Sequence, residues 1–342
     1  MPANPNIPTT PHRPIKSDLK SHKKVWEKEY PLRWPFMKIL RETSNLKQFY
    51  PEIDPYAEAY KFRENTWAIY SESFDGMGDP WIYVINGPKK ALIVDTGFGV
   101  GDLKGLVQKL IGDDQKEIIV ANTHSHFDHA YGNAQFDICY CHEDEEFLMR
   151  QTMNPHIWDY LYDHETMEGI YTEFDPRDII PYKDYELRLL KSYECIDLGD
   201  GYLVECIPLR GHTTGQAGYL DHQTGCLFMG DTTSAGRARE GDPHPENGCV
   251  ERLRDDFREI VKRIDEVSGV FPGHGPLDIT PVILQYFLNA LEAVIADPES
   301  ADEMRTMDFG HGKFTQCVKY IYQWTGIKYS SSAVYYDQVK KQ

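Results

Sequence analysis

The chain has 342 residues, of which 41% are hydrophobic, 26% charged and 13% aromatic, and this composition is typical of a globular protein with a full core. It excludes disorder, a collagen repeat and a coiled coil as overall descriptions. With 54 acidic against 36 basic residues, the formal net charge is -18, which argues against nucleic acid and anionic membranes as partners.

The N-terminus is rich in polar residues and proline where a signal peptide needs an apolar stretch, and no later run of about 18 apolar residues could span a bilayer. We therefore expect a cytoplasmic protein without a membrane segment. Seven cysteines without CxxC spacing indicate reduced thiols rather than a disulfide framework or a structural zinc site.

Residues 1–60 are interpreted as an N-terminal extension, with a flexible arm of about 20 residues followed by aromatic residues that pack onto the body or onto another subunit. Regular structure begins near Trp67. Apolar runs predict strands at 81–86, 91–97 and 117–123, and apolar residues at helical spacing predict a helix over 103–111. This strand, helix, strand order resembles a crossover unit of an α/β protein.

Residues 142–195 are rich in charged and aromatic residues and are interrupted by prolines, so we interpret them as an inserted helical cap. Strand character returns at 202–207, 218–220 and 226–230, and an apolar stripe over 250–264 predicts an amphipathic helix.

A short strand is expected at 269–271. Thr280 as N-cap and Pro281 at the first helical position predict the start of another helix, which ends near Asp297. The aromatic tail at 319–336 alternates well enough for a final hairpin. We expect one catalytic domain over 61–280, which includes the cap, and a C-terminal helix and tail over 281–342 that pack on it.

The most informative segment is HSHFDH, which follows the apolar run EIIVANT. In an extended segment His124 and His126 point to the same side, while Asp128 and His129 lie one turn further on. Three imidazoles and a carboxylate within six residues have no packing reason to follow a buried strand. The spacing therefore predicts two adjacent metal half-sites.

Three further polar residues follow predicted strands beside glycine and are candidates to complete these half-sites: His212, Asp231 and His274. Taken alone, a histidine flanked by glycine is more often an ordinary loop residue, and Asp95 could merely cap a turn. These residues indicate a metal site only because they occur together with the HxHxDH motif.

In these ordered motifs the sequence resembles the metallo-β-lactamase superfamily of binuclear metallohydrolases, over about residues 67–280. The resemblance implies an α/β fold, the αββα sandwich, with two central sheets, helices outside and metals at one sheet edge. Carried over position by position, it assigns His124, His126 and His212 to the first metal and Asp128, His129 and His274 to the second. Asp231 would bridge both metals, and Asp95 would orient ligands by hydrogen bonds.

Imidazole nitrogen and carboxylate oxygen suit zinc first and then iron or manganese, so two Zn²⁺ ions are the expected cofactor. A water between two such ions loses its proton near neutral pH and becomes the nucleophile. Asp128 or Asp231 is expected to move the proton.

Several branches of the family fit poorly. The short stretch between Asp231 and His274 leaves no room for the large domain of the nucleic-acid processing branch. The commonest lactamases place a cysteine where Asp231 stands, and the flavodiiron reductases a glutamate where His126 stands. The acyl-homoserine lactonases have a tyrosine where this chain has Ser234. Relatives similar to glyoxalase II bind glutathione through a basic C-terminal region, whereas this tail is aromatic.

The expected function is hydrolysis of a small carboxylic ester, thioester or lactone with an apolar or aromatic moiety. Phe147, Trp158 and Tyr162 of the cap are the candidate pocket residues, although aromatic residues of an insertion more often serve packing or dimer contacts. We expect a small-molecule substrate, and a homodimer is a further hypothesis from the aromatic extensions.

Three alternatives remain. A phosphodiester hydrolase would use basic side chains beside the site, for which Arg210, Arg237 and Arg239 are available. An iron-dependent sulfur dioxygenase would retain similar motifs. A binding protein without catalysis would lose ligands, and none is lost here.

Overall fold

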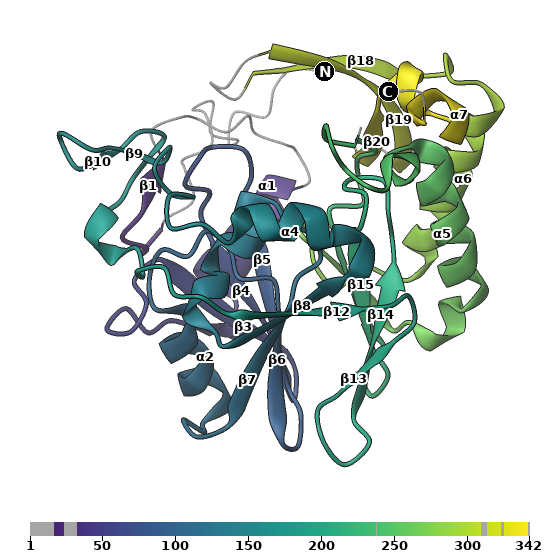
Figure 1. Ribbon diagram of the computed structural model, residues 1–342. Helices are drawn as coiled ribbons and strands as arrows, with labels where there is room; N and C mark the ends of the chain where they lie inside the picture. Colours follow the sequence, from purple (N-terminus) through teal and green to yellow (C-terminus); the bar gives the residue numbers. More distant parts are fainter. Residues whose placement is uncertain (1–16, 24–32, 237, 309–312, 323–324, 341–342) are drawn as a thin grey trace, which may run out of the picture.

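The computed structural model describes residues 17–23, 33–236, 238–308, 313–322 and 325–340, so most of the predicted N-terminal arm lies outside the described residues. Two β-sheets face each other and helices cover their outer faces (Figure 1). Among the described residues, no helix combines the length and the apolar character needed to cross a bilayer.

The larger sheet has eight strands, whose spatial order is β12 (Glu186–Leu190), β8 (Ile138–His142), β7 (Glu117–Ala121), β6 (Lys90–Val94), β5 (Trp81–Asn86), β4 (Thr66–Ser71), β3 (Ala57–Arg63) and β2 (Lys47–Gln48). The first four are parallel to one another and the remainder antiparallel. The smaller sheet has five strands, in the order β13 (Cys195–Asp197), β14 (Leu203–Pro208), β15 (Ala217–Asp221), β16 (Cys226–Gly230) and β17 (Gly269–Pro272).

Both faces of the larger sheet are apolar, because both are covered. On β5, Tyr83 and Ile85 face the smaller sheet, whereas Ile82 and Val84 face helix α2 (Leu103–Ile111). The Asp102 side chain accepts a hydrogen bond from the Gly105 N–H at the start of α2. Gly112 ends α2 in the left-handed conformation, as helix C-termini commonly do.

Helices α5 (Val250–Lys262) and α6 (Val282–Ala296) cover the outer face of the smaller sheet through a second apolar cluster. The chain thus has the α/β, αββα architecture that the sequence predicts. A three-stranded sheet of β18 (Glu303–Asp308), β19 (Lys313–Tyr322) and β20 (Thr325–Tyr329) contains the expected C-terminal hairpin and adds β18, which was not predicted.

The remaining elements are short. They are β1 (His22–Lys23), α1 (Arg33–Lys38), α3 (Phe127–Ala130), α4 (Glu146–Thr152), β9 (Tyr162–Asp163), β10 (Glu168–Gly169), β11 (Thr172–Glu173) and α7 (Tyr336–Val339), with several single turns.

The 142–195 segment differs in detail from the expected helical cap. Its one α-helix is α4, and short strands and turns follow, because Pro155, Pro176 and Pro181 interrupt any longer helix. Its last strand, β12, joins the larger sheet as an edge strand parallel to β8. The described cysteines are all free thiols, as expected.

Candidate metal centre

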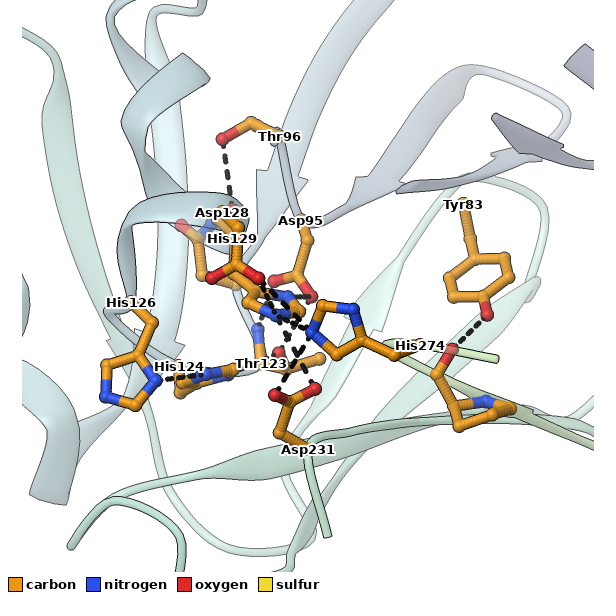
Figure 2. Close-up of polar contacts among 12 residues, drawn as sticks. Tyr83, Asp95, Thr96, Thr123, His124, His126, Asp128, His129, Asp231 and His274 are labelled. Carbon is orange, nitrogen blue, oxygen red and sulfur yellow. Dashed lines mark hydrogen bonds and ion pairs between the residues drawn. The ribbon is translucent and has the colours of Figure 1, made fainter. Parts of the chain in front are cut away.

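The loops that follow four strands bring seven nitrogen- and oxygen-bearing side chains to one edge of the two sheets, and Figure 2 shows six of them, all but His212. His124 and His126 lie between β7 and α3, and Asp128 and His129 lie on α3. The other three are His212 in the β14–β15 loop, Asp231 after β16 and His274 after β17.

His124, His126 and His212 form a three-histidine group. The Nδ1 atom of His126 lies 3.0 Å from the Nε2 atom of His124 and 3.0 Å from that of His212. The Thr123 hydroxyl donates to Asp95 at 2.8 Å, so its oxygen accepts from His124 Nδ1 at 3.0 Å, and His124 Nε2, which faces His126, carries no proton.

Asp128, His129 and His274 form a second group. The Nε2 atoms of His129 and His274 are 3.3 Å apart, and His274 Nε2 lies 3.2 Å from an Asp128 carboxylate oxygen. The opposite ring nitrogens are held in place, since His129 Nδ1 lies 2.8 Å from Asp95 Oδ2 and His274 Nδ1 donates to the Asp79 carbonyl at 2.8 Å. Each Nε2 atom therefore points into the group.

Asp231 lies between the two groups. Its Oδ2 atom is 3.2 Å from His274 Nε2 and 3.8 Å from His212 Nε2, and its Oδ1 atom is 3.5 Å from His129 Nε2. Gly273 permits this approach, because a Cβ atom there would stand 2.4 Å from Asp231 Oδ1. One carboxylate thus reaches both sets of nitrogen atoms.

A buried oxygen without a partner tests whether these residues fit metal ions. Asp231 Oδ1 is buried and has no hydrogen-bond partner among the described residues, an arrangement that costs free energy unless a cation or water satisfies the atom. The imidazole and carboxylate donors, with no thiolate, are those of zinc, iron and manganese sites. The residues therefore fit a pair of divalent metal ions.

The electrostatics differ between the two groups. Burial lowers the pKa of His126 to about 4 and that of His212 to about 3, so the three-histidine group is neutral at physiological pH. Burial also opposes protonation of His129, but Asp128 and Asp231 outweigh it and raise the pKa of His129 to about 9. The second group therefore attracts positive charge.

Asp95 connects the end of β6 to both donor groups. It is fully buried at the end of β6 and adopts a φ of 63°, a left-handed conformation that is uncommon for residues other than glycine. Its carboxylate accepts hydrogen bonds from Thr123 N–H at 2.7 Å and from the Thr123 hydroxyl, and it contacts His129. The strained turn thus aims the carboxylate at the residues that carry the imidazoles.

Two further contacts were not predicted as part of the site. Ser234 Oγ hydrogen-bonds to His212 Nδ1, and the buried Glu145 hydrogen-bonds to the loops on either side of the three-histidine group. In the sequence, Ser234 stands out only as the residue in place of the tyrosine of the acyl-homoserine lactonases. Nothing in the acidic run that contains Glu145 distinguishes it from its neighbours.

The three cap residues predicted for the pocket occupy different surroundings. Trp158 is buried and donates its indole N–H to the Phe98 carbonyl at 2.7 Å. Tyr162 is half-buried in β9, with its ring 4.5 Å from that of His164, and Phe147 is half-buried on α4. Trp158 and Tyr162 belong to one aromatic cluster, which also contains Phe127 from the metal motif.

The basic residues beside the site are also unequal. Arg210 forms ion pairs with Asp256 at 2.8 Å and Asp144 at 3.2 Å, so its charge is neutralised. Arg239 is exposed, and Arg237 lies outside the described residues.

Comparisons with known proteins agree with the geometry. The family model described as "Metallo-beta-lactamase superfamily" matches residues 75–138, which include Asp95 and the HxHxDH motif. Human acyl-coenzyme A thioesterase MBLAC2 is 27% identical over 206 residues, which cover 56% of this chain and 72% of that protein. The hydroxyacylglutathione hydrolase of a Synechococcus species is 27% identical over 228 residues, with 66% and 71% covered.

Solved structures with a similar arrangement include the DIM-1 metallo-β-lactamase, with 20% identity, a TM-score of 0.47 and 70% of this chain and 99% of that chain covered. The FIM-1 metallo-β-lactamase of Pseudomonas aeruginosa has 13% identity and a TM-score of 0.48, with 71% and 97% covered. The sequence motifs, the seven converging side chains and the matching family model lead to one conclusion. Residues 75–138 match the metallo-β-lactamase superfamily, and the chain is an enzyme of the hydrolase class that is similar to thioester hydrolases.

Proposed function

We propose that this protein is a metal-dependent thioesterase that hydrolyses small acyl thioesters. The observation that carries the proposal is the pair of donor groups joined by Asp231, a carboxylate within 3.8 Å of nitrogen atoms from both groups. The named relatives support the thioester, since one is an acyl-coenzyme A thioesterase and another a hydroxyacylglutathione hydrolase.

In this proposal the three-histidine group would hold one divalent ion, Asp128, His129 and His274 would hold the other, and Asp231 would be available to both. Zinc is the expected metal, with iron or manganese as alternatives. Bound divalent ions would supply Lewis acidity, which activates water near neutral pH and polarises a carbonyl oxygen.

The protein's own residues position the attacking water and accept its proton. Burial favours the neutral acid of Asp128, but His129 and His274 outweigh it and lower the pKa of that carboxyl, so Asp128 is ionised at neutral pH. We assign it as the acceptor of the proton from the attacking water, with Asp231 as the alternative acceptor.

The leaving group also favours a thioester. A thiol has a pKa of about 8.5, so a thiolate departs without a strong general acid, whereas an alkoxide needs one. Cleavage of a thioester therefore depends less than cleavage of an alkyl ester on whether Asp128 returns to the leaving group the proton that it takes from the attacking water. Acyl transfer from sulfur therefore suits this site better than cleavage of an unactivated alkyl ester.

The acyl group is proposed to lie against aromatic side chains beside the second motif. The Phe127 ring lies nearly parallel to that of His126, with centroids 6.0 Å apart, and is 6.2 Å from that of Tyr160 of the cap. Such a wall suits an apolar acyl chain. Phe127 and Tyr160 thus join Phe147, Trp158 and Tyr162 as pocket candidates.

The alternative of a phosphodiester hydrolase has less support, because Arg210 is already paired with two carboxylates and, of the described basic residues named for it, Arg239 alone has no ion pair. The sulfur dioxygenase alternative would require a single iron ion and oxygen consumption.

The test combines metal analysis of the purified protein with a substrate panel. We expect about two zinc ions per chain and thiol release from acyl thioesters that is lost in His126→Ala. Phosphodiester cleavage with inert thioesters, or oxygen consumption with one iron per chain, would overturn the proposal.

A further inference from the structure

Glu145 occupies a central position that the proposed chemistry does not use. It ends the turn Glu143–Glu145 after β8, and its side chain is completely buried. One carboxylate oxygen accepts the Ser125 N–H at 2.8 Å, and the other accepts the Thr213 hydroxyl at 2.7 Å and the Gly215 N–H at 3.0 Å. Glu145 thus satisfies donors on two separate loops.

These loops are the ones that carry the three-histidine group. Ser125 stands between His124 and His126, and Thr213 follows His212 directly. We propose that Glu145 is a positioning residue that sets the metal affinity of the three-histidine group by joining its two loops. This inference rests on the metal binding in the proposed function, but not on the identity of the substrate.

The backbone supports the same reading. A Cβ atom at Gly215 would stand 2.0 Å from the Glu145 backbone nitrogen, so the two segments touch with no room for a side chain. Asp144, the preceding residue, pairs with Arg210 at 3.2 Å, just before the same loop. The turn after β8 therefore contacts the His212 loop through two consecutive residues, Asp144 and Glu145.

The second group has a separate support. His274 Nδ1 donates to the Asp79 carbonyl, and the Asp79 carboxylate accepts the Tyr70 hydroxyl at 2.8 Å and the Ser73 N–H at 2.8 Å. None of the three hydrogen bonds of Glu145 described above reaches Asp128, His129 or His274. Loss of Glu145 should therefore weaken one ion selectively, whereas a general loss of folding would weaken both.

The experiment isolates each group in turn. His274→Ala leaves the three-histidine group intact, and His212→Ala leaves the second group intact. Glu145→Gln is added to each background, and the zinc affinity is measured by competition with a chromogenic chelator, without substrate. Gln keeps the size of the side chain, but its amide nitrogen would face the Gly215 N–H, so one of the two loops loses its acceptor.

In the His274→Ala background we expect Glu145→Gln to weaken zinc binding about 10- to 100-fold, as loss of the groups that orient metal ligands typically does. In the His212→Ala background we expect a change within about twofold. Thr213→Val, which removes one of the three hydrogen bonds, should have a smaller effect in the same direction.

Two controls separate positioning from folding. Tyr70→Phe removes a hydrogen bond to Asp79 and should therefore weaken zinc binding by the second group more than by the three-histidine group. Thr214→Val removes a hydrogen bond between the His212 loop and Asp242 without touching Glu145, so zinc affinity should stay unchanged in this variant. Equal weakening of both groups together with a large fall in the Tm of the metal-free protein would overturn the inference. So would unchanged zinc affinity in Glu145→Gln. Neither result depends on whether thioesters are hydrolysed.

Discussion

At the scale of single residues, the site depends on carboxylates whose two oxygens serve different partners. Asp95 contacts both Thr123 and His129, and Asp231 lies near both donor groups. A buried carboxylate is costly unless donors or cations surround it. We therefore expect the site to tolerate a change in the volume of Asp95 or Asp231 better than the loss of its negative charge.

Asp54 is a buried carboxylate outside the metal centre, and it provides a test of stability against pH. Burial raises the pKa of Asp54 to about 7, against about 3.9 in an unfolded chain. The folded protein therefore binds this proton more tightly. The resulting stabilisation is fully present below pH 4 and is lost as the pH rises through 7, with an upper limit of about 4 kcal/mol.

Asp54→Asn should remove this dependence, because an amide oxygen can still accept the Tyr56 N–H, which lies 2.9 Å from Asp54 Oδ1. We expect the difference between the Tm of the variant and the Tm of the original protein to become more positive as the pH rises from 5 to 8. Thermal unfolding across this range measures it. A constant difference in Tm would show that Asp54 is ionised throughout or equally protonated in both states.

At the scale of elements, the cap is attached to the body through Trp158. Its indole donates to the Phe98 carbonyl, and its ring is 5% exposed. Trp158→Phe keeps most of the apolar contact but leaves a carbonyl without its donor, at a cost of about 1–3 kcal/mol. We expect faster hydrogen exchange in residues 142–195 and little change in β14 to β16.

Tyr162→Phe is the matched control. Tyr162 is half-buried in the same aromatic cluster, and its ring contact with His164 survives the change. Its exchange profile should match that of the original chain. If Trp158→Phe accelerates exchange evenly over the whole protein, the tryptophan stabilises the fold globally rather than the cap.

The elements also indicate what local sequence can predict. Helix α2 spans the predicted residues 103–111, because its apolar spacing and its terminal Gly112 are both local signals. The sequence does not predict strand β3, because the charged Glu58 interrupts its apolar pattern, and this residue is buried through ion pairs with Arg41 and Lys47. Strand β12 was missed because its pairing with β8 bridges a long insertion.

The same distinction applies to the site. The HxHxDH spacing singles out four of the converging side chains, and the other three follow strands that the apolar pattern locates. Glu145 and the Asp79 carbonyl act through contacts between distant segments, which no motif spacing encodes. The donors could therefore be predicted, whereas the residues that orient them required the three-dimensional arrangement.

At the scale of the whole molecule, the net charge of -18 opposes the approach of an anionic substrate such as a coenzyme A thioester. If the proposed thioesterase takes coenzyme A thioesters, local cations are expected to offset this field. Arg239 is exposed and forms no ion pair among the residues that the structure describes, and its charge lowers the pKa of His126 after the larger effect of burial. Lys328, on the strand that pairs with Ser234, acts similarly on His212.

Arg239→Gln should therefore raise KM for acyl-coenzyme A by about 10- to 150-fold at low salt, since a hydrogen bond between a guanidinium and a phosphate is typically worth about 1.5–3 kcal/mol. The matched substrate is the same acyl group on N-acetylcysteamine, a neutral thiol, for which KM should not change. The difference between the KM changes for the two substrates should become smaller as added salt shortens the Debye length to below about 10 Å. Equal effects on the charged and the neutral thioester would instead place Arg239 against the acyl group or the loop fold, and the carrier would then be recognised elsewhere.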